Sequence, residues 1–373
     1  MANTLNLGNG NWATKKDSLL AYNSENGNFK PLAFDFTRNG CCATVVNKAG
    51  LIETVGGDIP RIDFSNDAKG ALLLEPTRSN LVTYSENLSN WTQDGATTLD
   101  NNIISPDGTL NASKITFNSG NERVYTFTNT TNGSFSAYFK GVQGKKVKLR
   151  DNSGTYFTEI TLTENWVRYY LYKETSNTNI QIQNIDANDV NVWGAQVEEG
   201  SYATSYIPTQ GSAVTRVADA CSQTPPTGVI GQTEGTLFTE FEFNYSDSNT
   251  QVLLKANQSS DANSVGIEIL GTTIKGLVNS QSSSIANIQG TIAIGTIKAA
   301  IAYKTNDIAF YVNGVQVGVI TSGSISFAGV VDILTIGHFS LNGGQYFPAS
   351  RPFNQTQIYN TRLSNAELQA LTS

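Results

Sequence analysis

Apolar and polar residues alternate along much of the chain between about residues 70 and 360. In 134–140 every second residue is apolar, and in 240–243 two phenylalanines fall on one side and two glutamates on the other. A period of two places successive side chains on opposite faces, which is typical of half-buried β-strands. Turn-forming clusters such as Asn-Ser-Gly at 152–154 separate these runs at the spacing of an all-β sandwich.

The clearest hairpin is predicted from Ile308 to Val319, with Asn313-Gly314 between its two alternating runs. Both turn residues tolerate the positive φ that a type I′ turn requires. One helix is predicted, at the end of the chain, because Ser364 is followed three residues later by Glu367, the pattern of a capping box. We expect about two helical turns, with an apolar side that packs on the last sandwich.

The predicted fold class is all-β: two antiparallel β-sandwiches (jelly rolls) in tandem behind an extended N-terminal segment, with a short C-terminal helix. The first 35 residues are rich in Asn, Gly and Lys with little periodicity, as expected of an arm that orders against a neighbour. A Pro-Pro-Thr-Gly interruption at 225–228 marks a boundary between the sandwiches. The predicted divisions are 1–79 (N-terminal arm with a small β region), 80–222 (first sandwich) and 233–373 (second sandwich).

Composition excludes several classes of function. The 373 residues include 24 Lys plus Arg and 31 Asp plus Glu, a formal charge of −7, and the cations are dispersed, which argues against nucleic-acid binding. No run of about 18 apolar residues occurs, so membrane insertion is not expected. His338 is the single histidine, which excludes mechanisms that need two. Cys41, Cys42 and Cys221 show no CxxC spacing, and we expect buried small residues rather than a disulfide framework.

Carboxylates are the remaining candidates for catalysis. Glu240 and Glu242 project from one face of a strand, as a pair flanking a glycosidic bond would, but no tight acidic cluster accompanies them. We interpret them as the solvated face of an outer strand, and the chain is not expected to be an enzyme. No cofactor is expected; calcium is left open, because the chain offers the carboxylates of Asp261, Asp307 and Asp332 without a regular loop spacing.

Aromatic residues are more informative. The chain has 4 Trp, 15 Tyr and 17 Phe, whose flat apolar faces can stack on sugar rings while amides and carboxylates hydrogen-bond the hydroxyls. The candidate glycan contacts are Trp91, Trp166, Asn342, Gln345 and Tyr346. For each aromatic candidate the alternative is a packing role in the core.

Several stretches of the sequence resemble bacteriophage virion proteins of the tail-fibre and receptor-binding type. These are FDFTR (34–38), ATVVN (43–47), GLIETV (50–55), PRIDF (60–64) and LLLEPTRSNL (72–81). A later group, WGAQVEEG (193–200), ATSYIPT (203–209) and AVTR (213–216), is similar to the end of a carbohydrate-binding-module-like jelly roll. The segment 233–373 resembles a laminin-G-like, concanavalin-A-like lectin sandwich in FYVNG (310–314), LTIG (334–337) and IYNTRLSNAEL (358–368).

The resemblance implies a non-enzymatic virion protein, a tail or head fibre or adhesin, that binds host-surface glycan without cleaving it. Its N-terminal arm would contact other virion proteins, and the C-terminal sandwich would meet the host through loops at 342–347 and 261–263. Linked copies raise the avidity of a weak site roughly 10²- to 10⁴-fold, so we expect a homo-oligomer, by analogy a trimer. The alternatives are a capsid or tail decoration protein with protein–protein contacts only, and a polysaccharide depolymerase.

Overall fold

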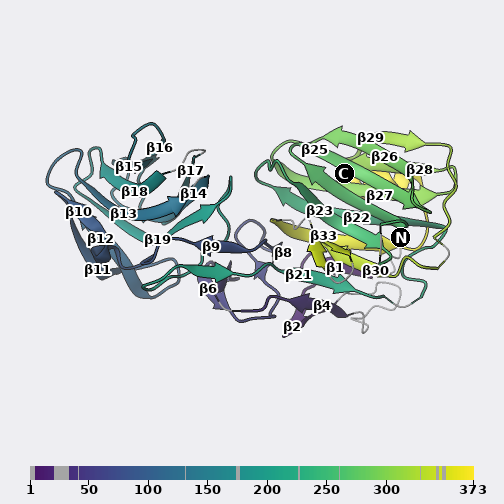
Figure 1. Ribbon diagram of the computed structural model, residues 1–373, viewed down its shortest axis with the longest axis horizontal. Helices are drawn as coiled ribbons and strands as arrows, with labels where there is room; N and C mark the ends of the chain where they lie inside the picture. Colours follow the sequence, from purple (N-terminus) through teal and green to yellow (C-terminus); the bar gives the residue numbers. More distant parts are fainter. Residues whose placement is uncertain are drawn as a thin grey trace. The chain divides into compact units, whose positions relative to one another are not determined.

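The computed structural model describes residues 5–20, 33–40, 42–130, 132–173, 177–225, 227–259, 261–327, 329–341, 344–346 and 350–373. The chain divides into two compact units, and Figure 1 labels most of their strands. Unit 1 consists of Met1–Asn39, Gly57–Pro76 and Ala218–Ser373, and unit 2 of Gly40–Gly56 and Thr77–Val217. Each unit is built from antiparallel sheets, and one short helix ends the chain, so the predicted all-β fold class is confirmed.

The N-terminal segment differs from the expected arm. Strand β1 (Leu5–Gly8) pairs with β33 (Arg351–Tyr359), and β4 (Ala33–Thr37) pairs with β21 (Ala220–Gln223), so both belong to unit 1. The predicted boundaries at 79 and 222 lie close to the divisions between the units at Pro76/Thr77 and Val217/Ala218, but each unit also collects segments that are distant in sequence. The sequence of a short strand with little periodicity does not indicate which strand it pairs with. The division into units depends on this pairing between distant parts of the chain.

Unit 1 is a sandwich of two large sheets. The first, of eight strands, has the order β29-β28-β27-β22-β33-β8-β7 with β1 also paired to β33, and the second, of nine, has the order β2-β3-β4-β21-β30-β23-β24-β25-β26. The remaining strands of this unit are β2 (Ala13–Lys15), β3 (Ser18–Leu20), β7 (Ile62–Asp63), β8 (Ala71–Leu74), β22 (Glu234–Phe243), β23 (Thr250–Asn257), β24 (Ser264–Leu270), β25 (Thr273–Ser280), β26 (Ser283–Thr291), β27 (Gly295–Lys304), β28 (Ile308–Val312), β29 (Val315–Ile320), β30 (Ile333–Ile336), β31 (Phe339–Leu341) and β32 (Gly344–Tyr346).

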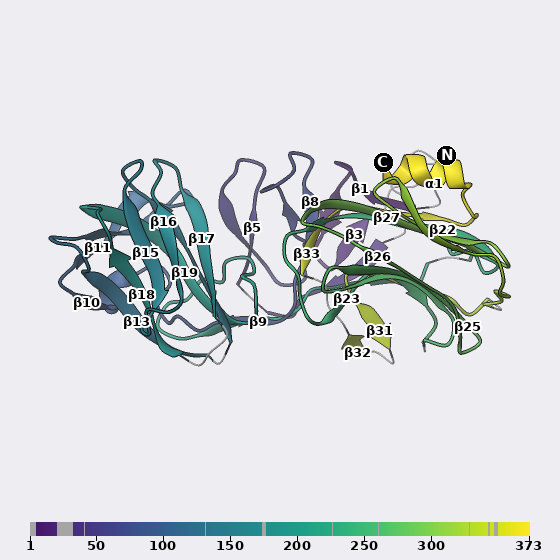
Figure 2. The ribbon, with the colours of Figure 1, turned by 90° about the horizontal axis from the view of Figure 1, so that it is seen from above.

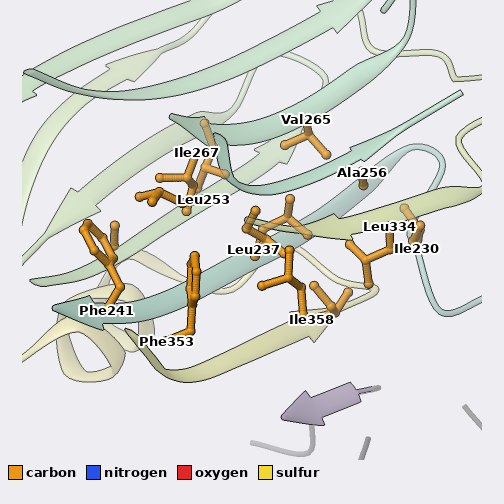
Figure 3. Packing of buried hydrophobic residues seen from close by; sticks show 14 of the residues in the cluster. Ile230, Leu237, Phe241, Leu253, Ala256, Val265, Ile267, Leu334, Phe353 and Ile358 are labelled. Carbon is orange, nitrogen blue, oxygen red and sulfur yellow. The ribbon is translucent and has the colours of Figure 1, made fainter. Parts of the chain in front are cut away.

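The core of unit 1 lies between these two sheets. Figure 3 shows side chains of β22 and β33, such as Leu237, Phe241 and Phe353, facing those of β23 and β24, such as Leu253 and Ile267. All five are at most 1% exposed. Burying one such side chain stabilises a fold by about 1.5–3 kcal/mol, which accounts for the alternating pattern along these strands.

Both local predictions in unit 1 are confirmed. Asn313 and Gly314 have φ values of 47° and 77° between β28 and β29, as a type I′ turn requires. Helix α1 (Asn365–Thr372) begins with a capping box in which Ser364 and Glu367 exchange hydrogen bonds. Its Leu368 is fully buried against the outer side of the eight-stranded sheet, over which Figure 2 shows the helix lying. No helix in the described part of the chain is long and apolar enough to cross a membrane.

Four charged side chains form a buried network in unit 1. Asp219 accepts from Arg38 at 3.0 Å and from Arg61 at 2.5 Å, and Arg61 also contacts Glu75 at 2.8 Å. Burial alone would lower the pKa of Arg61, but the charges of Asp219 and Glu75 raise it above its usual value. Arg38, Arg61 and Glu75 belong to the FDFTR, PRIDF and LLLEP segments. These segments therefore supply a structural network of unit 1.

The cysteines follow the expectation only in part. Cys221 is a buried free cysteine, as predicted, and burial raises the pKa of its thiol. Cys42 is disulfide-bonded, so the interpretation as a buried small residue is wrong for this position. An odd number of cysteines without CxxC spacing argues against a framework, but it does not exclude a single bond. Cys41 lies outside the described residues.

Unit 2 is a sandwich of two five-stranded sheets, ordered β10-β13-β18-β15-β16 and β11-β12-β19-β14-β17. Its elements are β5 (Ala43–Val46), β6 (Ile52–Val55), β9 (Arg78–Asn80), the 3₁₀ turn η1 (Leu88–Asn90), β10 (Thr92–Asp94), β11 (Thr97–Ile104), β12 (Leu110–Thr116), β13 (Arg123–Thr130), β14 (Gly133–Lys140), β15 (Lys146–Asp151), β16 (Phe157–Thr161), β17 (Val167–Lys173), β18 (Asn177–Asn184), β19 (Asp189–Glu199) and β20 (Val214–Arg216). Val147 and Ile182 of the first sheet join Phe135 and Val190 of the second in the core between them.

Candidate functional site

One outer face of unit 2 is covered by other parts of the same unit. On sheet β11-β12-β19-β14-β17, Trp193 packs with Ile52 of the β5–β6 hairpin and with Tyr206, whose ring centre lies 4.5 Å from that of Trp193. Tyr138 extends this cluster, at 5.6 Å from Trp193. Thr44 donates a hydrogen bond to the Tyr206 carbonyl at 2.6 Å, which holds the hairpin in place. We call this surface the covered face.

Figure 1 shows the ribbon of sheet β10-β13-β18-β15-β16, and we call the outer side of this sheet the open face. Residues directly opposite each other in antiparallel strands point to the same face, so the register defines rows across the sheet. The aromatic row consists of Thr92, Tyr125, Gln181, Arg150 and Phe157. The charged row consists of Asp94, Arg123, Gln183, Lys148 and Glu159. Phe127 and Asn179 begin a third row.

Large apolar rings stand exposed on the open face. Phe127 is 66% and Phe157 50% exposed, and the Tyr125 ring lies edge-on to Phe127 at 5.7 Å between centres. Three strand spacings separate Tyr125 from Phe157, which corresponds to about 14 Å. Exposed apolar side chains that cluster, rather than being scattered singly, mark interaction surfaces. The spacing suits a short extended ligand better than a single small ring.

Polar side chains between the rings are held in fixed positions. Arg150 donates from Nη1 to Gln183 at 2.7 Å and from Nε to the Asp151 carbonyl at 3.0 Å. Gln181, only 3% exposed, donates to Asn179 at 3.0 Å. Such second contacts fix the orientation of binding groups before a ligand arrives. The open face therefore combines flat apolar rings with one preorganised donor, the Arg150 guanidinium, above the buried Gln181.

The two tryptophan candidates have packing roles. Trp91 is 4% exposed, lies in the core of unit 2, and donates its indole N–H to the Tyr84 carbonyl at 3.0 Å. An indole enclosed in this way offers no free face for stacking on a sugar. Trp166 is partly buried against the Trp193 cluster and donates to the Ile104 carbonyl at 3.0 Å. Both tryptophans therefore contribute to the packing of unit 2.

The C-terminal candidates are only partly described. Gln345 and Tyr346 belong to β32, which pairs with β31, and their backbone alone is described. Asn342 lies outside the described residues, so a glycan contact by these three residues stays a prediction. In the other expected loop, Asn263 donates to Gln258 at 2.8 Å and accepts from the Gln281 backbone at 2.8 Å. Its side chain thus stabilises the local turn.

None of the residues of the open face was predicted from the sequence as a glycan contact. Their signal is present: 146–150 alternates cations with buried aliphatic residues, and Tyr125 and Phe127 lie two positions apart. Alternation shows that these side chains share a face of their own strand. It does not show that Phe157 lies in the same row as Tyr125, because the register between strands is needed for that.

Glu240 and Glu242 share a face of β22 as predicted, but β22 is an interior strand rather than an outer one. Asn354 donates to both carboxylates, at 3.4 and 2.9 Å, and Gln355 donates to Glu240 at 2.6 Å. Glu240 also borders a polar pocket of about 270 Å³ that Lys69 and Lys298 help to line. The pair is therefore part of a polar network between β22 and β33.

A second carboxylate pair, which the sequence did not indicate, lies in unit 2. Asn111 donates to Glu86 at 3.1 Å and to Asp107 at 3.0 Å. Burial is the main cause that raises the pKa of Glu86, and the charge of Asp107 adds to it. Burial alone would raise the pKa of Asp107, but hydrogen bonds from neighbouring groups lower it overall. Tyr206 donates to Glu86 at 2.8 Å, so this pair too is held by protein donors.

Comparison with known proteins gives structural likeness only. No protein-family model and no curated protein matches the sequence. A carbohydrate-binding module, CBM40 of the Ruminococcus gnavus IT-sialidase, is 16% identical, with 38% of this chain and 84% of that one covered and a TM-score of 0.34. The binding domain of botulinum neurotoxin DC, solved in complex with rat synaptotagmin II, is 10% identical, with 42% and 40% covered and a TM-score of 0.34. A SAP-like pentraxin from Limulus polyphemus is 16% identical, with 38% and 70% covered and a TM-score of 0.29. Scores this low carry no functional argument.

Proposed function

We propose that this chain is a non-enzymatic glycan-binding protein and that the open face of unit 2 is its binding surface. The observation that supports this proposal is the aromatic row, in which Tyr125 and Phe157 lie on either side of Arg150. Sugar rings stack their apolar faces on aromatic side chains, and their hydroxyls pair with polar groups such as the Arg150 guanidinium. The proposed site lies in unit 2 rather than in the C-terminal sandwich, where the sequence led us to expect it.

We further propose that the protein is a fibre or adhesin on a bacteriophage particle, on the strength of the resemblance of 34–81 and 193–216 to such proteins. Contact with other virion proteins is assigned to unit 1, because the N-terminal strands belong to its sheets. A homotrimer remains part of the proposal. Several copies of one shallow site would supply the avidity that a single site lacks.

The test is the binding of labelled full-length protein to a panel of bacterial cells, before and after periodate oxidation of surface sugars. We expect periodate-sensitive binding, weakened about tenfold or more by Tyr125→Ala/Phe157→Ala, since each stacked ring contributes on the order of 1 kcal/mol. Tyr170→Ala is the matched control, because Tyr170 is 66% exposed but belongs to β17 of the other sheet.

Three results would contradict the proposal. Binding that survives periodate indicates a protein partner, as expected of a decoration protein. New reducing ends released from the cell-surface polysaccharide indicate a depolymerase. Absence of binding to every strain in the panel removes the adhesin role.

A further inference from the structure

The outward-facing residues in the strands of the open face are more positive than negative, although the whole chain has a formal charge of −7. Two ion pairs lie on it, Arg123–Asp94 at 2.7 Å and Lys146–Glu159 at 2.6 Å. The two other cations, Lys148 and Arg150, form no ion pair with any residue in the described ranges. Among the outward-facing residues of the five strands, four are positive and two are negative, a difference of 4 − 2 = +2. Glu122 and Asp186 lie outside these strands, at the border of the face, where they interact electrostatically with Asp94 and Lys146.

Both cations without an ion pair lie on β15, the strand next to the β16 edge of the sheet. Arg150 stands between Gln181 and Phe157 in the aromatic row, and Lys148 is the next outward-facing residue on the same strand. Glu159 lies opposite Lys148 but contacts Lys146. The Lys148 ammonium is 5.0 Å from the centre of the Phe157 ring, so cation and ring are presented together.

The guanidinium of Arg150 is preorganised for a ligand. Its Nε and Nη1 donate to the Asp151 carbonyl and to Gln183, which fixes the plane of the group. Its Nη2 approaches Gly154 so closely that a Cβ there would lie 2.7 Å away. Glycine at 154 thus leaves room for the guanidinium edge. A fixed, planar donor of this kind matches the geometry of a carboxylate.

We propose that the open face recognises an acidic glycan, with a carboxylate of the sugar chain between Lys148 and Arg150 and sugar rings stacked on Tyr125 and Phe157. This inference rests on the proposed function and narrows its ligand. A neutral glycan would cover the two cations and give them no counter-charge, which is unfavourable. A carboxylate replaces their water with charge-assisted hydrogen bonds, which are roughly twice as strong as neutral ones.

The test compares acidic polysaccharides with their carboxyl-reduced forms. Full-length protein is titrated with oligosaccharides of polygalacturonate, hyaluronan and colominic acid, and with the carboxyl-reduced form of each. We expect at least one acidic polymer to bind, with affinity about tenfold or more lower after reduction. Affinity also falls with rising salt, because exposed charges are screened.

Variants assign the effect to the two cations. Arg150→Gln should weaken acidic binding about tenfold or more, Arg150→Lys less, and Lys148→Gln provides a second variant that disturbs no hydrogen bond of Gln183. Lys114→Gln removes the same charge from β12 of the other sheet and should leave affinity unchanged. Circular dichroism of each variant checks that unit 2 stays folded.

The inference and the proposed function can fail separately. Equal affinity for acidic and reduced forms, or binding to none of the six polymers, overturns the acidic specificity. The acidic specificity is also overturned if Arg150→Gln and Lys148→Gln have no effect while Tyr125→Ala/Phe157→Ala abolishes binding. In that case the glycan-binding function still stands. If the full-length protein shows no periodate-sensitive binding to cells, the proposed function itself fails.

Discussion

Replacement of His338 tests the electrostatics of unit 1 with one titrating group. His338 is 3% exposed, and its Nδ1 lies 3.2 Å from the Ile336 carbonyl oxygen. Burial is the main cause that lowers the pKa of the imidazole from 6.5 to about 4, and the hydrogen bond to Ile336 opposes it in part. The folded protein therefore holds a neutral imidazole in a pH range where the unfolded chain protonates.

The sign and size of the effect follow from this difference. The unfolded chain titrates near pH 6.5, so stability is fully present above that pH and falls as the pH drops toward 4. Because the pKa falls from 6.5 in the unfolded chain to about 4 in the folded protein, the free energy of unfolding decreases by about 3 kcal/mol below pH 4. At pH 5 the decrease is about 2 kcal/mol. The His338→Gln variant has no imidazole at this position, so its free energy of unfolding lacks this dependence on pH.

The assay is urea unfolding of the full chain at pH 7.5, 6 and 5. Hydrogen exchange in peptides of β22 reports the unfolding of unit 1, to which this strand belongs. Any constant cost of the His338→Gln substitution cancels when each protein is compared with itself across pH. The wild type should lose about 2 kcal/mol more than the variant between pH 7.5 and 5. Equal losses in the two proteins would refute the reasoning.

Three further changes probe other parts of the account. Asp219→Asn should destabilise unit 1 by about 3–5 kcal/mol, because it leaves Arg38 and Arg61 buried with too little negative charge; a loss below about 1 kcal/mol in urea would disprove this. Ser364→Ala removes the helix cap and should cost about 1 kcal/mol, seen as faster hydrogen exchange in α1, and unchanged exchange would speak against it. Phe127→Ala should weaken glycan binding and change thermal stability little, since the ring is 66% exposed; marked destabilisation would mean that Phe127 is a core residue.

Features decided by local chemistry could be predicted from the sequence. The hairpin at 308–319 follows from the φ preferences of two turn residues, and the start of α1 follows from a serine and a glutamate three positions apart. Both depend on interactions within a few residues, so neighbouring side chains contain all the information needed.

Features decided by pairing between distant segments could not be predicted. Leu5–Gly8 carries little pattern of its own, yet it pairs with Gln355–Ile358 at the other end of the chain. The aromatic row has the same origin, because Tyr125 and Phe157 come together only through the registers of β13, β18, β15 and β16. Trp91 shows the converse: a residue type suited to sugars lies in the core, where its large apolar surface is most stabilising.

The most direct measurement of the central claim is a bacterial glycan array probed side by side with the full-length protein, Tyr125→Ala/Phe157→Ala and Tyr170→Ala. We predict that the full-length protein and Tyr170→Ala bind the same subset of glycans and that the double variant loses them. Retention of the same glycans by the double variant would place the site elsewhere in the chain, and an array without any bound glycan would contradict glycan binding itself.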